Sequence, residues 1–296
     1  MMTSSALTPV IGVLYPGELG SALGRVLVRD GFKVVTTLAG RSARTERLCR
    51  EAALETVATV TELVKRSDIV LSLVTPAAAL DVATTYAALA SLAPAGAVFV
   101  DVNSIGPERA RTVDHILAGG GVAFVDAAIH GLAAQLEKRG TLYLSGGRAQ
   151  EMAGLLGRSL RTRVVGAEPG QASAFKMLLG GMSKGLVSLF LELAQLGGQL
   201  GVLDAALDEY RHYYPGIMEA VERLAPTYPQ HAARRAEEMA ELENTMQHAG
   251  MTPHMAAGAQ AVIASVGALE LARGREGKSW TVKEVVAEIL RQQARA

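Results

Sequence analysis

Short apolar runs alternate with helix-like stretches along the first half of the chain. The runs are rich in Val, Ile and Leu without strict polar alternation, which is typical of strands in a parallel sheet covered by helices on both faces. Strands are predicted at residues 8–14, 32–38, 68–74, 97–103 and 123–129, with 141–145 and 163–166 as possible extensions of the same sheet. Helices are predicted at residues 18–30, 42–53, 61–66, 76–90, 107–118 and 148–159. This alternation predicts a doubly wound sheet with right-handed crossovers.

The pattern changes after residue 170, where strands stop and long helical segments begin. Residues 171–200 predict one long helix that is apolar almost all round, and such a helix is buried. Amphipathic helices are predicted at residues 203–224, 229–249, 253–273 and 281–295, with Thr281 as the N-cap of the last. The expected fold class is an α/β Rossmann-type N-terminal domain, residues 1–168, and an all-α C-terminal domain, residues 169–296, joined by the long helix.

A membrane span is the competing interpretation of residues 171–200. Lys184 and Glu192 interrupt the apolar sequence, and placing two charges in lipid is costly. We therefore expect a core helix and no membrane partner.

Composition narrows the class of protein further. About half of the 296 residues are apolar and 20% are charged, as in soluble globular proteins. The 29 basic and 29 acidic side chains cancel, so no global field attracts a polyanion, and no local basic patch predicts a nucleic-acid partner. Cys49 is the single cysteine, and residues 1–9 lack the pattern of a signal peptide, so we expect a cytoplasmic protein. His115, His212, His231, His248 and His254 show no metal-ligand spacing, and no metal is expected.

A glycine turn joins the first predicted strand to the first predicted helix. In the sequence GVLYPGELG, residues 12–20, Gly17 and Gly20 take the second and third positions of a G-x-G-x-x-G motif, whereas Tyr15 stands at the first. Glycine lets the backbone approach a pyrophosphate, whose charge the helix N-terminus stabilises. The alternative is a turn with a purely structural role. If a dinucleotide binds, the Tyr15 side chain either points away from the phosphates or covers part of the dinucleotide.

The end of the second predicted strand indicates which dinucleotide would bind. An acid there would accept hydrogen bonds from a ribose 2′-hydroxyl, but the first acid after this strand is Glu46. Arg41 can clamp a 2′-phosphate and Ser42 can donate to it, so NADP is favoured over NAD. The alternative is that Arg41 and Arg44 are solvated charges at a helix start. The cofactor contacts expected are Tyr15, Pro16, Gly17, Glu18, Leu19, Arg41, Ser42, Val74, Thr75 and Asn103.

Four stretches resemble the β-hydroxyacid dehydrogenase superfamily, which includes 3-hydroxyisobutyrate and 6-phosphogluconate dehydrogenases and imine reductases. They are the glycine turn at 12–20, DVNSIGP at 101–107, DAAIHG at 126–131, and the segment from Gly166 through Gly170-Gln171 to Lys176. The resemblance covers nearly the whole chain and implies an NAD(P)-dependent oxidoreductase whose catalytic lysine is Lys176. It is strongest with a branch that has a phosphogluconate-dehydrogenase-like C-terminal domain.

Two positions depart from the family pattern. His130 stands where the family has a serine before glycine in its substrate loop, and Gly180 stands where an asparagine usually follows the lysine by one turn. The fold and cofactor are therefore safer expectations than the family's small β-hydroxy acid substrate. The missing side chain at Gly180 is expected to leave volume for a bulkier substrate.

The family role of Lys176 is to move a proton to or from the substrate while a hydride is transferred. An amine buried beside a cofactor loses hydration, which favours its neutral form and suits general acid–base work. The alternative is that Lys176 reaches solvent or pairs with a carboxylate.

Substrate contacts are expected from residues that follow the strands and from the helical domain. Some of them have a structural alternative: Lys184 can pair with a carboxylate, His130 can be a structural donor, and the helix face with Arg235 and Glu238 can be solvated, since Arg234 and Glu238 have the spacing of an intrahelical ion pair. The residues are Ser104, His130, Gly131, Gly180, Lys184, Arg235 and Glu238.

Three functions remain open at this stage. The leading one is an NADP-dependent dehydrogenase acting on a hydroxy acid or its keto form. Imine or bulky-ketone reduction is the second, and a non-catalytic NADP-binding redox sensor is the third. Relatives cover the long helix by interlocking two helical domains, so a homodimer is expected.

Overall fold

The computed structural model describes residues 8–131, 133–275 and 277–294. Most of the segment 1–9, which was expected to lack a signal peptide, lies outside the described residues, and so does the last residue of the predicted helix 281–295. The chain divides into two compact units, Met1–Lys176 and Met177–Ala296. This division falls inside the long helix, whereas the sequence placed the domain boundary before it, at 168/169.

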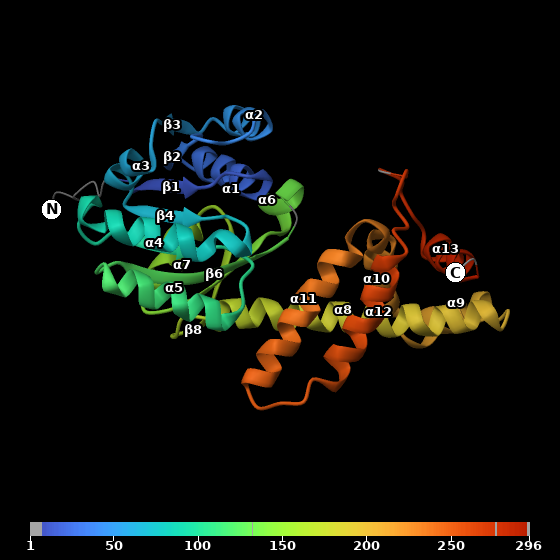
Figure 1. The fold of residues 1–296 in the computed structure, drawn as a ribbon. Coiled ribbons are helices and arrows are strands. Elements are labelled where there is room, and N and C mark those ends of the chain that lie inside the picture. The colour runs from blue at the N-terminus through green and yellow to red at the C-terminus, as the bar shows by residue number, and fades with distance from the viewer. Residues whose placement is uncertain (1–7, 132, 276, 295–296) are drawn as a thin grey trace. The chain divides into compact units, whose positions relative to one another are not determined.

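The first unit is built on an eight-stranded sheet with the order β3-β2-β1-β4-β5-β6-β7-β8 (Figure 1). The strands are β1 (Val10–Leu14), β2 (Lys33–Thr37), β3 (Glu55–Val57), β4 (Ile69–Ser72), β5 (Val98–Asp101), β6 (Ala123–His130), β7 (Thr141–Ser145) and β8 (Arg161–Gly166). All neighbours pair in parallel except β6 and β7, which are antiparallel. The predicted sheet and its extension are confirmed. The three-residue β3 was missed because it is too short to show a period.

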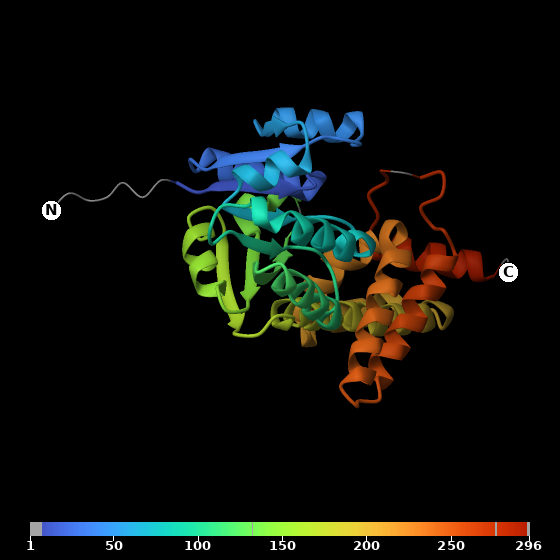
Figure 2. The ribbon, with the colours of Figure 1, turned by 60° about the vertical axis from the view of Figure 1, so that its left-hand side comes forward.

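Helices cover both faces of this sheet (Figure 2). They are α1 (Glu18–Arg29), α2 (Ala43–Glu51), α3 (Val60–Arg66), α4 (Ala79–Leu89), α5 (Pro107–Gly119), α6 (Leu136–Arg139) and α7 (Ala149–Leu156). One apolar core joins the sheet to α1, α2, α6 and α7, and a second joins it to α3, α4 and α5. Because both faces are buried, the central strands carry apolar side chains at almost every position, as the sequence showed.

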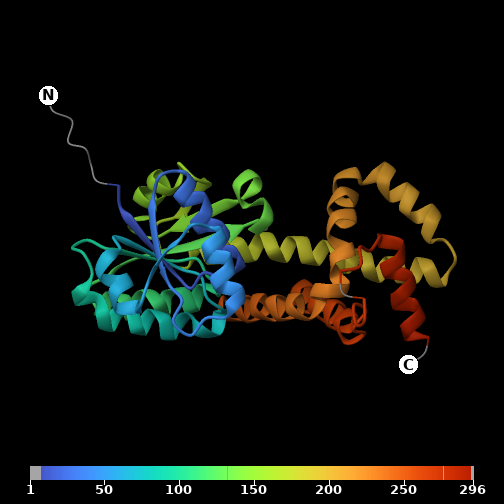
Figure 3. The same cartoon turned by 90° about the horizontal axis from the view of Figure 1, so that it is seen from above.

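The second unit is helical. The long helix α8 (Gln171–Gln199) runs into it and is followed by α9 (Leu203–Tyr213), α10 (Pro215–Leu224), α11 (Tyr228–His248), α12 (His254–Ala268) and α13 (Val282–Gln293). Helices α11 and α12 lie side by side as a hairpin, and Figure 3 shows α9 and α10 leading from the end of α8 back to α11.

Two local features of the second unit are explained by single residues. The predicted helix 203–224 is two helices because Pro215 lacks a backbone N–H and starts a new helix at its first position. Thr281 caps α13 as predicted: its side chain accepts from the amide of Glu284, whose carboxylate accepts from the Thr281 amide.

Helix α8 is buried on one side only, contrary to the expectation of a fully buried helix. Val187, Leu191 and Ala194 belong to the core of the second unit. On the other side six large apolar side chains are 43–67% exposed. We call them the exposed stripe: Leu178, Met182, Leu189, Leu193 and Leu196 on α8, and Leu200 directly after it. By length and composition α8 passes the test for a membrane-spanning helix, which core helices of soluble proteins also pass.

Candidate active site

The carboxyl ends of the parallel strands carry most of the predicted site residues. The strand order reverses between β1 and β4, since β1 is followed by β2 and β3 on one side and the chain resumes with β4 on the other. Doubly wound sheets bind ligands at this switch point, outside the carboxyl ends of the strands. The glycine turn follows β1, Val74 and Thr75 follow β4, and Asn103 follows β5. The fold thus brings these residues, which are far apart in the sequence, to the same edge of the sheet.

The glycine turn leaves the start of α1 open to a ligand. The amide of Gly17 donates to the carbonyl of Tyr15 at 2.9 Å, and α1 begins at the next residue without a side-chain cap among the described residues. A Cβ built on Gly17 would meet no described atom within 4 Å, whereas one on Gly20 would lie 3.4 Å from the Tyr15 carbonyl oxygen. The first amides of a helix lack intrahelical partners, so this terminus fits a pyrophosphate.

Tyr15 and Arg41 form a pair beside this turn. The guanidinium carbon of Arg41 lies 4.9 Å from the centre of the Tyr15 ring, a cation–π arrangement. Tyr15 is half-buried and Arg41 is exposed, so the ring supports the guanidinium while leaving its N–H groups toward solvent. The sequence had placed both residues at the cofactor, but their mutual contact was not foreseen.

The start of α2 carries two further polar residues, the N-cap Ser42 and Arg44. Ser42 caps α2, and its hydroxyl accepts from the amide of Thr45 at 3.3 Å. Glu18, the first residue of α1, pairs with Arg44 at 3.1 Å, which leaves Arg41 as the arginine supported by Tyr15. Arg41 and Ser42 are adjacent at the start of α2, where a 2′-phosphate would require donors.

Asn103 ties the ends of β4 and β5 together. Its side-chain carbonyl accepts from the amide of Val74 at 2.5 Å, and its side-chain NH₂ donates to Ser72 at 3.1 Å and to Asp101 at 2.9 Å. Asp101 also accepts from the backbone amide of Asn103 at 2.8 Å. Burial raises the pKa of Asp101 to about 7. The hydrogen bonds from Asn103 lower this pKa, and the nearby charge of Asp126 raises it by a smaller amount. This network shapes the loops that follow both strands.

Lys176 lies on the first turns of α8, and its ammonium donates to the hydroxyl of Ser104 at 2.8 Å. Ser104 follows β5 in the loop that leads to α5. The structure therefore brings together two predicted residues separated by 72 positions in the sequence. An amine held by a hydroxyl beside the carboxyl ends of the strands is suited to exchange a proton with a bound substrate.

A buried network positions the start of α8 and was missed by sequence reasoning. Asp126 on β6 accepts from the amide of Ser173 at 3.0 Å, from its hydroxyl at 2.7 Å, and from the hydroxyl of Ser145 at 3.1 Å. The Ser145 hydroxyl accepts from the amide of Ala172 at 2.9 Å. Three donors converge on one carboxylate, so the first turn of α8, and Lys176 with it, is held to the sheet. Polar residues inside apolar runs were the available signal.

Packing fixes the same turn from two other directions. The ring of Phe175 lies 4.7 Å from that of Tyr143 on β7 and 5.7 Å from the guanidinium of Arg163 on β8. Gly170 has φ +92°, and a Cβ there would come within 2.8 Å of the Pro107 carbonyl oxygen at the start of α5. A glycine is required at this junction for both its backbone angle and the close approach.

His130 and Gly131 lie at the end of β6, and both are exposed. Gly131 has φ +136°, and a Cβ there would be 3.2 Å from the backbone of Gly140, so glycine is needed for the turn that leaves β6. The predicted substrate loop therefore follows the same sheet edge as the loops after β4 and β5.

The predicted substrate residues of the second unit contact one another. The ammonium of Lys184 on α8 lies 2.9 Å from the carboxylate of Glu238 on α11, which also pairs with Arg234. The expectation that Gly180 leaves an empty volume is wrong: a Cβ there would lie 2.8 Å from the Lys184 ammonium. The space is taken because helical side chains point back toward the N-terminus, so Lys184 covers the preceding turn.

Arg235 is held beside this cluster. Its Nη2 donates to the hydroxyl of Thr227 at 2.7 Å, and its guanidinium carbon lies 4.3 Å from the centre of the Tyr228 ring. Burial lowers the pKa of Arg235 from its usual value, yet an arginine side chain stays charged. Its Nη1 is buried and has no hydrogen-bond partner among the described residues.

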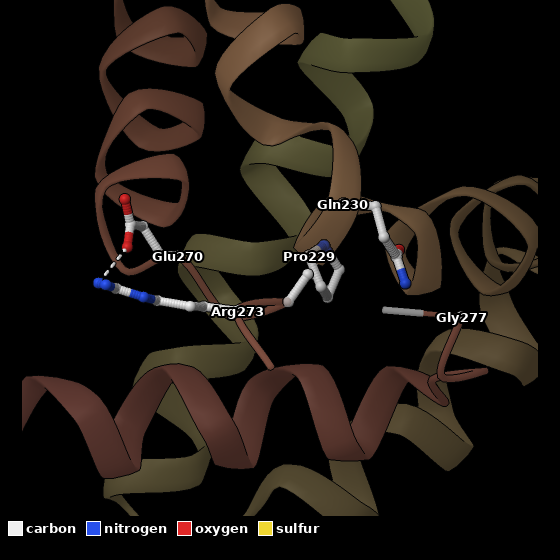
Figure 4. Close-up of a pocket in the computed structure, with 6 residues that line it drawn as sticks. Pro229, Gln230, Glu270, Arg273 and Gly277 are labelled. Carbon is white, nitrogen blue, oxygen red and sulfur yellow. Dashed lines mark hydrogen bonds and ion pairs between the residues drawn. The ribbon is translucent and has the colours of Figure 1, made fainter. Parts of the chain in front are cut away.

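Within the described ranges no cluster of three or more His, Cys, Asp or Glu side chains is arranged to hold a metal ion. A pocket of about 390 Å³ in the second unit is lined by Pro229, Gln230, Glu270, Ala272, Arg273 and Gly277 (Figure 4). Glu270 and Arg273 pair with each other at 3.0 Å on its rim, and the pocket holds none of the predicted site residues.

Comparisons with known proteins bear on both units. Residues 10–156 match the NAD binding domain of 6-phosphogluconate dehydrogenase, and residues 198–266 match a domain of unknown function called DUF1932. An uncharacterised 28.5 kDa protein from Methanothermus fervidus is 29% identical over 255 residues, which are 83% of this chain and 94% of that protein.

Solved structures are similar to the chain over nearly its whole length. A conserved protein of unknown function, described as structurally similar to 3-hydroxyacid dehydrogenases, is 28% identical with a TM-score of 0.74, over 90% of this chain and 98% of that one. A 3-hydroxyisobutyrate dehydrogenase from Mycobacterium tuberculosis shares the fold at 18% identity with a TM-score of 0.77, over 98% of this chain and all of that one. With a nucleotide-binding sheet, a helical second unit and these relatives, the chain belongs to the β-hydroxyacid dehydrogenase superfamily of NAD(P)-dependent oxidoreductases.

Proposed function

We propose that the protein is an NADP-dependent oxidoreductase that interconverts a small-molecule alcohol and its carbonyl form, with a hydroxy acid or its keto form as substrate. The observation that carries the proposal is the Lys176–Ser104 hydrogen bond of 2.8 Å, made beside the carboxyl ends of the strands. A redox sensor without catalysis would not need an amine held in this position. The cytoplasm is the compartment we propose for this reaction.

The chain's own residues would divide the work as follows. When bound, the nicotinamide supplies the hydride to the carbonyl carbon or accepts it from the alcohol carbon. Lys176 gives a proton to the substrate oxygen during reduction and takes one from the hydroxyl during oxidation. Ser104 orients the amine, and the Asp126 network keeps the first turn of α8 in place. Both help to hold the proton donor at the reacting oxygen, which is where positioning lowers the barrier.

The test of this function is oxidation of NADPH with a panel of β-keto acids, bulkier ketones and cyclic imines. We expect turnover with β-keto acids, and NADPH to be used in preference to NADH. Turnover confined to imines or bulky ketones would replace the proposal with the second candidate. Binding of NADPH without turnover on any member of the panel would favour a sensor.

Arg41 is proposed to select NADP over NAD. Replacing Arg41 with alanine should reduce the preference for NADPH over NADH about tenfold to a hundredfold, because a charge-assisted hydrogen bond contributes about 1.5–3 kcal/mol. The measurement is the ratio of kcat/KM for the two cofactors. Arg47→Ala is the matched control, because Arg47 lies on α2, just after Arg41, and pairs with Glu51 at 3.9 Å; it should keep the wild-type ratio. An unchanged ratio in Arg41→Ala would remove the assignment.

A second copy of the chain is proposed as the partner that covers the exposed stripe of α8. Six apolar side chains in the repeating three-, four- and seven-residue steps of a helix face form a contiguous surface of the kind that marks protein interfaces. Light scattering should therefore give twice the 31.0 kDa mass of one chain. Leu193→Glu with Leu196→Glu should give monomers, whereas Leu92→Glu, an exposed leucine outside the stripe, should not. A wild-type monomer at micromolar concentration would contradict the dimer.

A further inference from the structure

Tyr15 stands where a G-x-G-x-x-G motif has its first glycine, and its side chain is held in place. The ring is half-buried and packs against the apolar core that joins the sheet to α3, α4 and α5. Its backbone is fixed as well, because the Tyr15 carbonyl accepts from the amide of Gly17 at 2.9 Å in the turn before α1. A residue with a large, anchored side chain therefore makes the turn that the motif assigns to glycine.

Arg41 lies over this ring and comes from a separate turn. Its guanidinium carbon is 4.9 Å from the centre of the Tyr15 ring. Its amide donates to the carbonyl of Leu38 at 2.9 Å, so the backbone after β2 is ordered while the side chain is exposed. Arg44 nearby pairs with Glu18 at 3.1 Å, whereas no carboxylate among the described residues pairs with Arg41. The charge of Arg41 thus remains available to an anion.

Stacking and hydrogen bonding use different parts of a guanidinium. The flat face packs on an aromatic ring, and the N–H groups at the edge donate to phosphate oxygens. An exposed arginine loses rotamer freedom when a ligand immobilises it, and this loss weakens binding. The Tyr15 ring restricts the Arg41 side chain before the ligand arrives, so less freedom remains to be lost. A ligand without a 2′-phosphate gains less from this restriction.

We propose that Tyr15 is a positioning residue for cofactor choice: its ring holds Arg41 where the guanidinium receives a 2′-phosphate, so the two residues select NADP as a unit. The inference rests on the proposed function for its choice of NADP, and it assigns part of that choice to a residue that does not itself bind the 2′-phosphate. The turn after β1 thereby contributes to selection as well as to the binding of the pyrophosphate.

Three variants separate the ring from the guanidinium. Tyr15→Leu keeps an apolar side chain against the core and removes the ring, Tyr15→Phe keeps the ring and removes the hydroxyl, and Arg41→Ala removes the guanidinium. Arg158→Ala is the matched control for Arg41→Ala, because the Arg158 guanidinium also lies over a ring, 5.2 Å from the centre of Phe32. Phe32 precedes β2 at the amino edge of the sheet, whereas Arg41 follows β2 at its carboxyl edge.

The experiment is calorimetric titration of each protein with adenosine 2′,5′-bisphosphate and with AMP, which differ only in the 2′-phosphate. The wild type should bind the bisphosphate about tenfold or more tightly than AMP, because the guanidinium makes charge-assisted hydrogen bonds. Tyr15→Leu should lower this preference about threefold to tenfold through the lost restriction of Arg41. Tyr15→Phe and Arg158→Ala should keep it. General damage to the turn would weaken both ligands equally and leave the preference unchanged, which would overturn the role of Tyr15.

The double variant tests whether the two residues act as a unit. In the Arg41→Ala background, Tyr15→Leu should lower the preference no further, because the ring acts only through the guanidinium. Independent, additive losses would overturn the inference, and so would a loss in Tyr15→Phe as large as that in Tyr15→Leu.

The wild-type titration separates this inference from the proposed function. Equal affinity of the wild type for the bisphosphate and AMP would count against the choice of NADP itself and remove the inference with it. A clear wild-type preference that Arg41→Ala reduces and Tyr15→Leu leaves intact would overturn the role of Tyr15 alone, with the proposed function unaffected.

Discussion

Replacing Lys176 with alanine is expected to lower kcat for carbonyl reduction by about 10²–10⁴-fold, the usual contribution of a positioned general acid. The ammonium lies 2.8 Å from Ser104, and alanine removes the only group that we propose to protonate the substrate oxygen. Binding of NADP should change little, because the glycine turn follows β1 and Arg41 precedes α2, away from Lys176 in the sequence. The measurement is single-turnover oxidation of NADPH with the best substrate of the panel.

Two controls make the effect of Lys176→Ala specific. Lys65→Ala removes an exposed lysine of α3 and should leave kcat at the wild-type value. Ser104→Ala keeps the amine but removes the hydroxyl that orients it, so it should cause a smaller loss and shift the pH profile of kcat. Exogenous methylamine should partly restore turnover to Lys176→Ala. If Lys176→Ala turns over at the wild-type rate, Lys176 is not the proton carrier.

The second large effect is a pH dependence of stability that comes from Asp101. Its pKa is about 7 in the folded chain, because burial disfavours the carboxylate, against a usual value of 3.8. Between these two values the folded chain keeps a proton that the unfolded chain has released, so the free energy of unfolding falls as pH rises from about 4 to 7 and stays reduced above 7. Three pKa units correspond to about 4 kcal/mol at 1.36 kcal/mol per unit.

Asp101→Asn removes this titration while keeping a side-chain carbonyl that can accept from the Asn103 amide. Its unfolding free energy relative to the wild type should therefore rise by up to about 4 kcal/mol between pH 4 and pH 8, measured by urea unfolding across that range. Ser72→Ala is the control, because it removes another partner of the Asn103 side chain without removing a titrating group. Its cost should be the same at every pH. A constant difference for Asp101→Asn would show that the carboxyl is already ionised at pH 5.

The secondary structure was predicted well where a local pattern decides it. Apolar runs of four or more residues located the central strands, because strands buried on both faces carry apolar side chains throughout. Errors occurred where that signal is weak or another residue intervenes. The edge strand β3 has only three residues, and Pro215 divides a continuous amphipathic pattern into α9 and α10. Strands β4 and β5 end at Ser72 and Asp101, two residues before the predicted ends at 74 and 103. Val74 and Asn103 therefore lie in the loops that follow the strands.

The candidate site was predicted in part for a similar reason. The glycine turn and Arg41-Ser42 are short motifs that each follow a predicted strand. They can be recognised in the sequence because their position after a strand is enough to place them at the ligand-binding edge of the sheet. Lys176 was named as the catalytic lysine from the family resemblance, and its role stays a prediction. Its anchoring by Asp126 and Ser173 was not found, because those residues are 47 positions apart and meet only when α8 docks on β6.

The sequence by itself determined the alternating α/β half, the helical second half, the glycine turn and the lack of an acid after the second strand. Periodicity and local residue chemistry decide these features, and both can be read from neighbouring positions. Only the tertiary structure decided that Tyr15 supports Arg41, that Ser104 holds Lys176, that Lys184 fills the space over Gly180, and that one side of α8 stays exposed. Each of these depends on side-chain direction or on contacts between distant segments, which no local pattern encodes.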